Sequence, residues 1–156
     1  GVMLAGIVLG PVRGAAAVLV VIVLAGVGLP VLSGGSGGLG VFVGPTAGYL
    51  LGWIPGVVVT GLIARSGRAG LTWWRVALGA IVGGIAVVYA LGIPGVTLVT
   101  GIPLADSALS SLVFVPGDLI KAVVATLLAL ALWRAYPPAF AFARVPRAAE
   151  RVSAGR

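Results

Sequence analysis

The chain has 156 residues, of which 60% are hydrophobic and 8% are charged, and its formal net charge is +7. About a quarter of the residues of a soluble domain are charged, so this composition excludes a water-facing globule and predicts an all-α integral membrane protein, a compact transmembrane helix bundle. Cysteine and histidine are absent and the acidic residues number three, which excludes disulfides, Cys/His metal sites and a histidine base, and argues against an enzyme. No cofactor is expected. The arginines adjoin hydrophobic segments, so a membrane explains the positive charge better than nucleic acid does.

The first predicted spans come from an uncharged segment between Arg13 and Arg65 that is too long to cross a membrane only once. The serine and glycine run at 33–38 divides it into spans at 14–32 and 45–64, each close to the roughly 20 residues that a crossing needs. Residues 1–9 are apolar but too short to cross, and they are predicted to be one part of a helix.

A further uncharged helix is predicted at 75–93, closing at Pro94. Residues 94–115 hold prolines, glycines and serines without a sustained period, so they are predicted to form a loop.

The last helix is predicted at 116–134, because Pro116 suits a first helical turn and a carboxylate at Asp118 favours the positive end of the helix dipole. The transmembrane bundle is therefore expected to cover residues 1–136. Residues 137–156 contain further arginines and are predicted to form a basic cytoplasmic tail at the membrane surface.

The distribution of arginine predicts how the bundle is oriented. The loops at 33–44 and 94–115 contain no lysine or arginine, whereas the other connections hold Arg13, Arg65, Arg68, Arg75 and Arg134. The arginine side is cytoplasmic by the positive-inside rule, and indoles beside these arginines anchor helices at that interface: Trp73, Trp74 and Trp133. Both uncharged loops and the start of the last helix are thus expected outside, with the C-terminus in the cytoplasm.

Asp118 and Lys121 are the charges expected inside a span, and their spacing of three residues places them on one face of the last helix. They could form an ion pair that only neutralises itself within the bundle. They could instead form a polar site for a solute that enters from outside. The second interpretation is favoured, because intramembrane charges usually mark a substrate or ion path.

The glycine-rich loop that ends at Gly44, together with Thr46 and Tyr49 just after it, could close over a ligand through its exposed backbone groups. A flexible hairpin between spans explains the same composition equally well. No Lys-Ser/Thr pair follows the glycines, which argues against a nucleotide site.

Small and aromatic residues inside the spans are first explained by packing. Glycines recur every four residues, at Gly48, Gly52 and Gly56 and again at Gly79 and Gly83. This spacing favours close approach of helix backbones within the bundle. Trp53 and Tyr89 could be core aromatics or stacking walls for a flat ligand, and the core interpretation is slightly favoured.

Several short strings then carry a more specific signal. GVFVGPTAGYLLG at 40–52 and FVPGDLIK at 114–121 are the longest, and shorter ones are LGPVRG at 9–14, GLPV at 28–31 and YALG at 89–92. In the same order, they resemble GPTGGYLLG, PFLPGDLIK, LGPRRG, GLPVF and YLLG of the BioY family. These proteins are the biotin-specific substrate-binding (S) components of energy-coupling-factor (ECF) transporters.

The resemblance covers about residues 1–135 and implies biotin uptake across the bacterial cytoplasmic (inner) membrane by a multi-pass protein. It implies a pocket built from outward loops and helix ends, and partners comprising a transmembrane coupling subunit and two ATPase subunits. The substrate-binding residues it implies are Asp118, Lys121, Gly44, Thr46, Tyr49 and Tyr89. The ureido N–H groups of biotin would donate to Asp118, whereas Lys121 would donate to the ureido carbonyl or to the carboxylate of biotin, a choice that stays open.

Two departures from the family pattern accompany the resemblance. Ala47 replaces the second glycine of GPTGGY. The family has six spans, and the sequence opens inside what resembles the second, so the first span is expected to be missing.

The alternatives to a biotin S component are an S component for another vitamin and a ligand-free structural membrane subunit. A membrane-embedded enzyme is the least favoured alternative.

Overall fold

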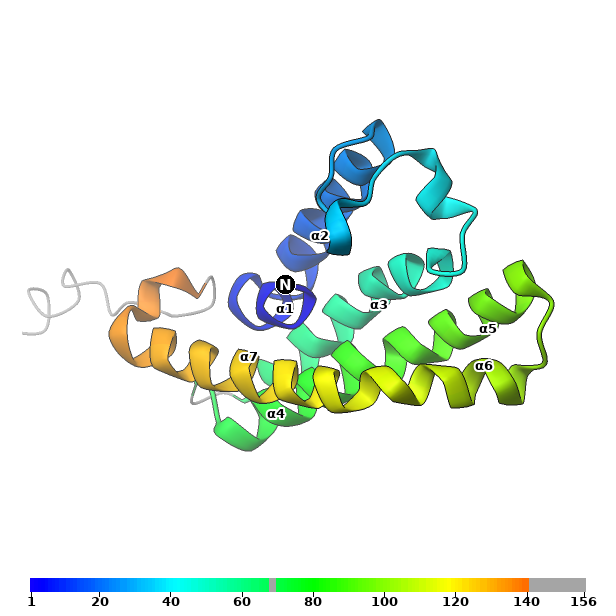
Figure 1. Cartoon of the computed structure of the whole chain (residues 1–156). Helices are drawn as coiled ribbons and strands as arrows, with labels where there is room; N and C mark the ends of the chain where they lie inside the picture. The colour runs from blue at the N-terminus through cyan, green and yellow to red at the C-terminus, as the bar shows by residue number, and fades with distance from the viewer. Residues whose placement is uncertain (68–69, 141–156) are drawn as a thin grey trace, which may run out of the picture.

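The computed structural model describes residues 1–67 and 70–140, and this part of the chain is helical with no strand. Its α-helices are α1 Val2–Leu9, α2 Pro11–Val27, α3 Ala47–Ala64, α4 Trp73–Ile81, α5 Val88–Thr100, α6 Leu104–Ser111 and α7 Val115–Ala135. Shorter helical turns connect them: η1 Ser33–Gly35, η2 Leu39–Phe42, the π-helical η3 Val82–Val87, η4 Leu112–Phe114 and η5 Pro137–Ala139. Figure 1 shows α2 and the loop after it rising on one side of α3, with α5, α6 and α7 on the other.

Helix α3 is the centre of the bundle, because it packs against α1, α2, α4, η3 and α5. Its glycines allow this close packing. A Cβ atom added at Gly48 would lie 2.7 Å from the backbone oxygen of Leu91, and one at Gly56 would lie 2.7 Å from that of Gly83. From the opposite helix, a Cβ atom at Gly79 would lie 2.8 Å from the oxygen of Thr60. The predicted packing role of the glycine repeats is therefore confirmed.

The helix predicted at 75–93 does not close at Pro94, and that prediction is wrong. The helical path runs through α4, η3 and α5 to Thr100, and it ends where Gly101 adopts a left-handed conformation with φ of 75°. Proline removes one backbone hydrogen bond, a loss that a helix can tolerate when neighbouring helices hold it. Here the next residue, Gly95, meets the backbone of Gly48 in α3.

The predicted loop at 94–115 is also wrong: residues 94–100 belong to α5, and only the connection at 101–103 lies between α5 and the next helix. Residues 104–111 form α6, which leads through η4 into α7. The serines are compatible with this helix, because two of their hydroxyls donate to carbonyl oxygens one turn earlier. Ser110 Oγ lies 2.9 Å from the oxygen of Asp106, and Ser111 Oγ lies 2.7 Å from that of Ser107.

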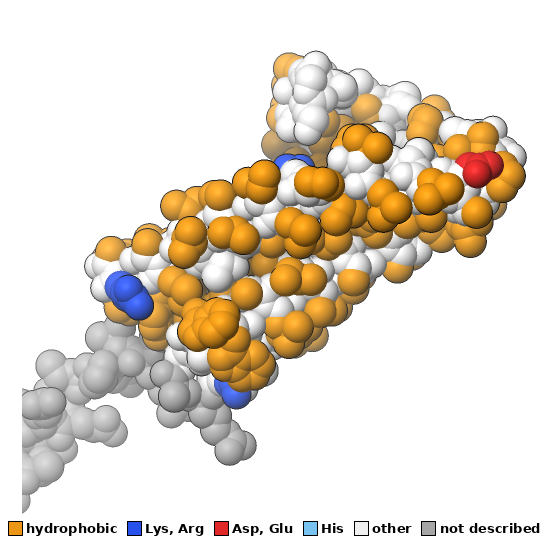
Figure 2. All heavy atoms as spheres, turned by 60° about the horizontal axis from the view of Figure 1, so that its bottom comes forward, with side chains coloured by type: hydrophobic (Ala, Val, Ile, Leu, Met, Phe, Trp, Pro, Cys, Tyr) orange, Lys and Arg blue, Asp and Glu red, His pale blue; other side chains and the backbone are white. Residues whose placement is uncertain are grey.

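Within the described residues, three helical stretches are long and apolar enough to cross a membrane by length and composition: Ala47–Ala64, Trp73–Thr100 and Leu104–Ala135. The segment expected at 14–32 is the shorter apolar helix α2, which ends at Gly28 with φ of 106°. Figure 2 shows hydrophobic side chains over most of the visible face, with basic groups at its lower left and its upper middle and an acidic group at its right end.

Two arginines near the connection between α3 and α4 contact other residues of the bundle. Arg65 Nη2 donates to the carbonyl oxygen of Val8 over 3.1 Å, and burial together with the charge of Arg13 lowers the pKa of Arg65. The guanidinium of Arg75 lies 4.9 Å from the ring centroid of Trp74. Two of the sequence predictions concern residues outside the described part of the chain: the cytoplasmic position of Arg68, and the basic tail beyond Phe140.

Candidate substrate-binding site

A cavity of about 840 Å³ lies among α1, α2, α3, η3, α5 and α7, and the loop after α2 contributes to its wall. This volume is within the usual range for small-molecule sites, about 300–1,000 Å³. The side chains around it are mostly apolar. Its polar side chains are Ser33, Thr46, Tyr49, Tyr89, Asp118 and Lys121.

Asp118 is the charged centre of this wall. It lies in the first turn of α7, just after the helical path enters α7 from α6 and η4. Lys121 Nζ lies 2.7 Å from its Oδ1 atom, and the hydroxyl of Tyr89 donates to its Oδ2 atom over 2.6 Å. The side chain of Asp118 is only 17% exposed whereas that of Lys121 is 73% exposed, so the carboxylate is fixed and the ammonium group can move.

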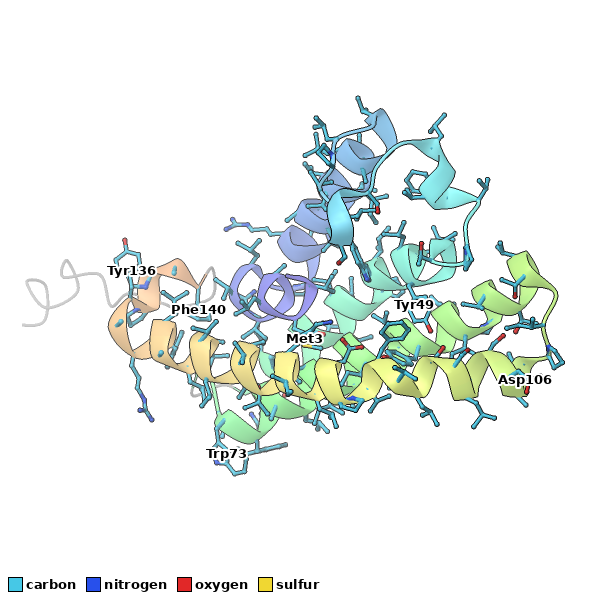
Figure 3. The ribbon with its side chains drawn as sticks, viewed as in Figure 1. Met3, Tyr49, Trp73, Asp106, Tyr136 and Phe140 are labelled. Atoms are coloured by element: carbon cyan, nitrogen blue, oxygen red, sulfur yellow. The ribbon has the colours of Figure 1, made fainter. Side chains whose placement is uncertain are left out.

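Two tyrosines form an aromatic corner beside this carboxylate. The rings of Tyr49 and Tyr89 meet edge to face, with centroids 5.6 Å apart and planes at 90°. The hydroxyl of Tyr49 lies 2.7 Å from Oγ of Ser111, on α6. Figure 3 shows Tyr49 pointing from α3 towards the α6–α7 side of the bundle.

Most of the residues proposed from the sequence meet at the cavity. Asp118, Lys121, Thr46, Tyr49 and Tyr89 all lie along its wall, although they come from three separate parts of the chain. Gly44 does not line it. Instead its carbonyl oxygen accepts a hydrogen bond from the amide of Ala47 over 3.0 Å, at the turn that leads into α3.

The structure adds residues that sequence reasoning missed. Met3, at the start of α1, lines the cavity. Trp53 fits both interpretations offered for it, because it lines the cavity and also packs against a buried hydrophobic cluster of α2 and α3. Phe114 lines it from the turn before α7, inside a segment predicted to be a loop. The sequence offered one usable signal, since Phe114 begins the FVPGDLIK string that also contains Asp118 and Lys121.

The chemistry of this wall suits an organic ligand. Carboxylate oxygens accept hydrogen bonds from N–H groups, an ammonium group donates to carbonyl or carboxylate oxygens, and aromatic rings cover apolar surface. Within the described residues no group of His, Cys, Asp or Glu could hold a metal ion. The site can therefore bind a small molecule that has both polar ends and an apolar body.

Known proteins resemble this chain over most of its length. "Biotin transporter BioY" of Rhizobium etli is 50% identical over 142 residues, covering 88% of this chain and 76% of the relative. "Biotin transporter BioY" of Rhodobacter capsulatus is 49% identical over 148 residues, covering 89% and 78%. The solved structure of the S-component for biotin from an ECF-type ABC transporter is 34% identical with a TM-score of 0.79, covering 85% of this chain and 71% of that one.

These similarities agree with the sequence motifs and with the fold. The fold shared with a solved S-component, together with the long apolar helices, confirms the predicted all-α membrane helix bundle. The model of the BioY family matches residues 1–138. Because that match covers the whole helical bundle and relatives reach 50% identity, the chain belongs to the BioY family.

Proposed function

We propose that this chain is the membrane-embedded S component of an ECF transporter for biotin, which it captures from outside the cell. The observation that carries the proposal is the fixed carboxylate of Asp118, held by Lys121 and Tyr89 on the wall of a cavity of ligand size. The names of relatives at 50% and 49% identity support biotin as the substrate. The chain is then a transporter subunit and not an enzyme.

Biotin has the chemical groups that this wall can recognise. Its ureido ring carries two N–H groups that can donate to Asp118, and its thiophane ring and valeryl chain are apolar and can pack against Tyr49 and Trp53. Lys121 pairs with Asp118 without ligand, yet its exposed ammonium group can turn to the ureido carbonyl or to the carboxylate of biotin. Gly44 would act through its backbone, by shaping the turn that presents Thr46.

The partners proposed are a transmembrane coupling subunit and two ATPase subunits, which would use ATP to drive release to the cytoplasm. The solved S-component to which this chain is similar comes from an ECF-type ABC transporter. The arginines near the α3–α4 connection support a cytoplasmic position for that end and for the C-terminus, in a bacterial cytoplasmic membrane.

The direct test is titration of the purified protein, in detergent or nanodiscs, with biotin and with two other vitamins as controls. Saturable binding of biotin alone is expected. Asp118→Asn should weaken it by about 5- to 150-fold, because the ureido donors would then meet an uncharged amide. Binding of another vitamin in place of biotin would identify a different S component, and folded protein that binds none would overturn the proposal.

A ligand-free structural subunit is the second candidate, because the structure contains the Asp118–Lys121 ion pair that it requires. In that case each of Asp118→Asn and Lys121→Met should destabilise the bundle by leaving one charge unmatched, and the double variant should recover most of the stability. Under the binding proposal the double variant loses biotin affinity whatever its thermal midpoint. Measuring both quantities for the three variants separates the candidates.

A further inference from the structure

Tyr49 is held in place from three directions by residues of other helices. Its hydroxyl lies 2.7 Å from Ser111 Oγ, and its ring edge meets Tyr89 with centroids 5.6 Å apart. Its ring also lies against Gly92 of α5, so closely that a Cβ atom added at Gly92 would collide with the Cδ1 and Cε1 atoms of Tyr49. Few conformations other than the observed one are open to a ring that is held in this way.

The hydrogen bond between Tyr49 and Ser111 has a defined direction. Ser111 is 4% exposed, and its one hydroxyl proton is donated to the carbonyl oxygen of Ser107 over 2.7 Å. A serine hydroxyl has one proton and two lone pairs, so Tyr49 must be the donor and Ser111 Oγ the acceptor. Ser107 is in turn fixed to α5, because its Oγ accepts a hydrogen bond from Thr97 over 2.9 Å.

Ser111 and Gly92 are both buried, and neither is among the residues that line the cavity. Their contacts nevertheless determine where the ring of Tyr49 lies along the cavity wall. We infer that Ser111 and Gly92 are positioning residues of the substrate-binding site, which act by fixing the ring of Tyr49. This inference rests on the proposed function. A wall that is already in its bound position spares the ligand the cost of ordering it, so losing either contact weakens binding.

Two substitutions remove the same hydrogen bond from its two ends. Ser111→Ala and Tyr49→Phe should each weaken biotin binding by about 3- to 10-fold, which is what the loss of one neutral hydrogen bond produces. The double variant Ser111→Ala/Tyr49→Phe should be no weaker than either single variant. The matched control is Ser110→Ala, since Ser110 lies on the same helix and its hydroxyl bonds to carbonyl oxygens of that helix, those of Asp106 and Ser107.

The third variant acts on the ring and not on the hydroxyl. Gly92→Ala should displace the ring of Tyr49 and weaken binding by more than about 10-fold, because an added methyl group cannot share that space. Gly117→Ala is its control: this glycine is exposed, lies in α7, and its added Cβ atom would meet nothing within 4 Å. Biotin affinity in Gly92→Ala equal to that of Gly117→Ala would overturn the role of Gly92.

A measurement without ligand separates this inference from the proposed function. With 3,5-difluorotyrosine at position 49, a held ring gives separate fluorine NMR resonances for the fluorine atoms on its two edges, whereas a rapidly turning ring gives one averaged resonance. Separate resonances are expected for the wild type and Ser110→Ala, and one resonance for Ser111→Ala. Failure of the wild type to bind biotin would overturn the proposed function alone. Spectra and affinities of Ser111→Ala that match the wild type would overturn the positioning role, as would a lower thermal midpoint with unchanged affinity.

Discussion

Helix α3 packs closely against η3 and α5 at Gly56. A Cβ atom added at Gly56 would lie 2.7 Å from the backbone oxygen of Gly83 and 2.8 Å from Cγ2 of Val88, so it could be accommodated only if a backbone moved. Gly56→Ala should therefore lower the free energy of unfolding by about 1–3 kcal/mol. The thermal midpoint in detergent measures this loss. Gly117→Ala should leave the midpoint unchanged, and an equal effect of both substitutions would contradict the packing argument.

A second residue-scale prediction concerns Gly10, at the corner between α1 and α2. Gly10 has φ of 88°, and the position of its missing Cβ atom is occupied by the guanidinium of Arg65. Gly10→Ala should destabilise the protein by about 1–3 kcal/mol through backbone strain, and more if Arg65 loses its bond to Val8. Comparing the double variant Gly10→Ala/Arg65→Ala with Arg65→Ala alone isolates the backbone strain, because both lack the Arg65 side chain and its bond to Val8. A thermal midpoint of Gly10→Ala equal to that of the wild type would exclude both effects.

At the scale of elements, the serine-rich segment before α7 is the point at which sequence and structure differ most. Hydrogen exchange should find slow amides in the last turns of α5, at 95–101, and in α6 from Ser107 onward, with faster exchange in the first turn of α6, at 104–106. Amides at 95–101 that exchange as fast as those at 104–106 would restore the loop interpretation.

The sequence predicted α3 and α7 closely because their signals are local: an uncharged apolar run, and a proline followed by an acid in a first turn. It failed at α6 because the composition of serine and proline does not reveal that the hydroxyls of Ser110 and Ser111 donate to carbonyl oxygens one turn earlier. For the candidate site too, the sequence revealed the residues with a local signal and not those without one. Asp118 and Lys121 stood out as charges in an apolar span, whereas the partner of Tyr49 lies 62 positions away and left no trace in any local pattern.

At the scale of the whole molecule, the absence of native cysteine makes the orientation directly testable. Single cysteines at Ser36 and Ser110 should react with an impermeant thiol reagent added to intact cells, and one at Ser66 should not. Ser110 is used because Ser107, on the same helix, is fully buried, whereas these three serines are exposed. Labelling should be done without biotin, which could shield Ser36. Reaction of Ser66→Cys with protection of Ser36→Cys would reverse the orientation.

The Asp118–Lys121 pair also affects how the protein enters the bilayer. Both charges belong to one helix and are three residues apart, so they can neutralise each other before any other helix is present. A carboxylate that relied on a partner from a distant helix would cross the hydrocarbon alone, which costs several kcal/mol. The acid can therefore enter the bilayer already paired, and Tyr89 of α5 can add its hydrogen bond once the bundle has formed. The short spacing that pairs the two charges in the folded protein thus also lowers the cost of inserting its last helix.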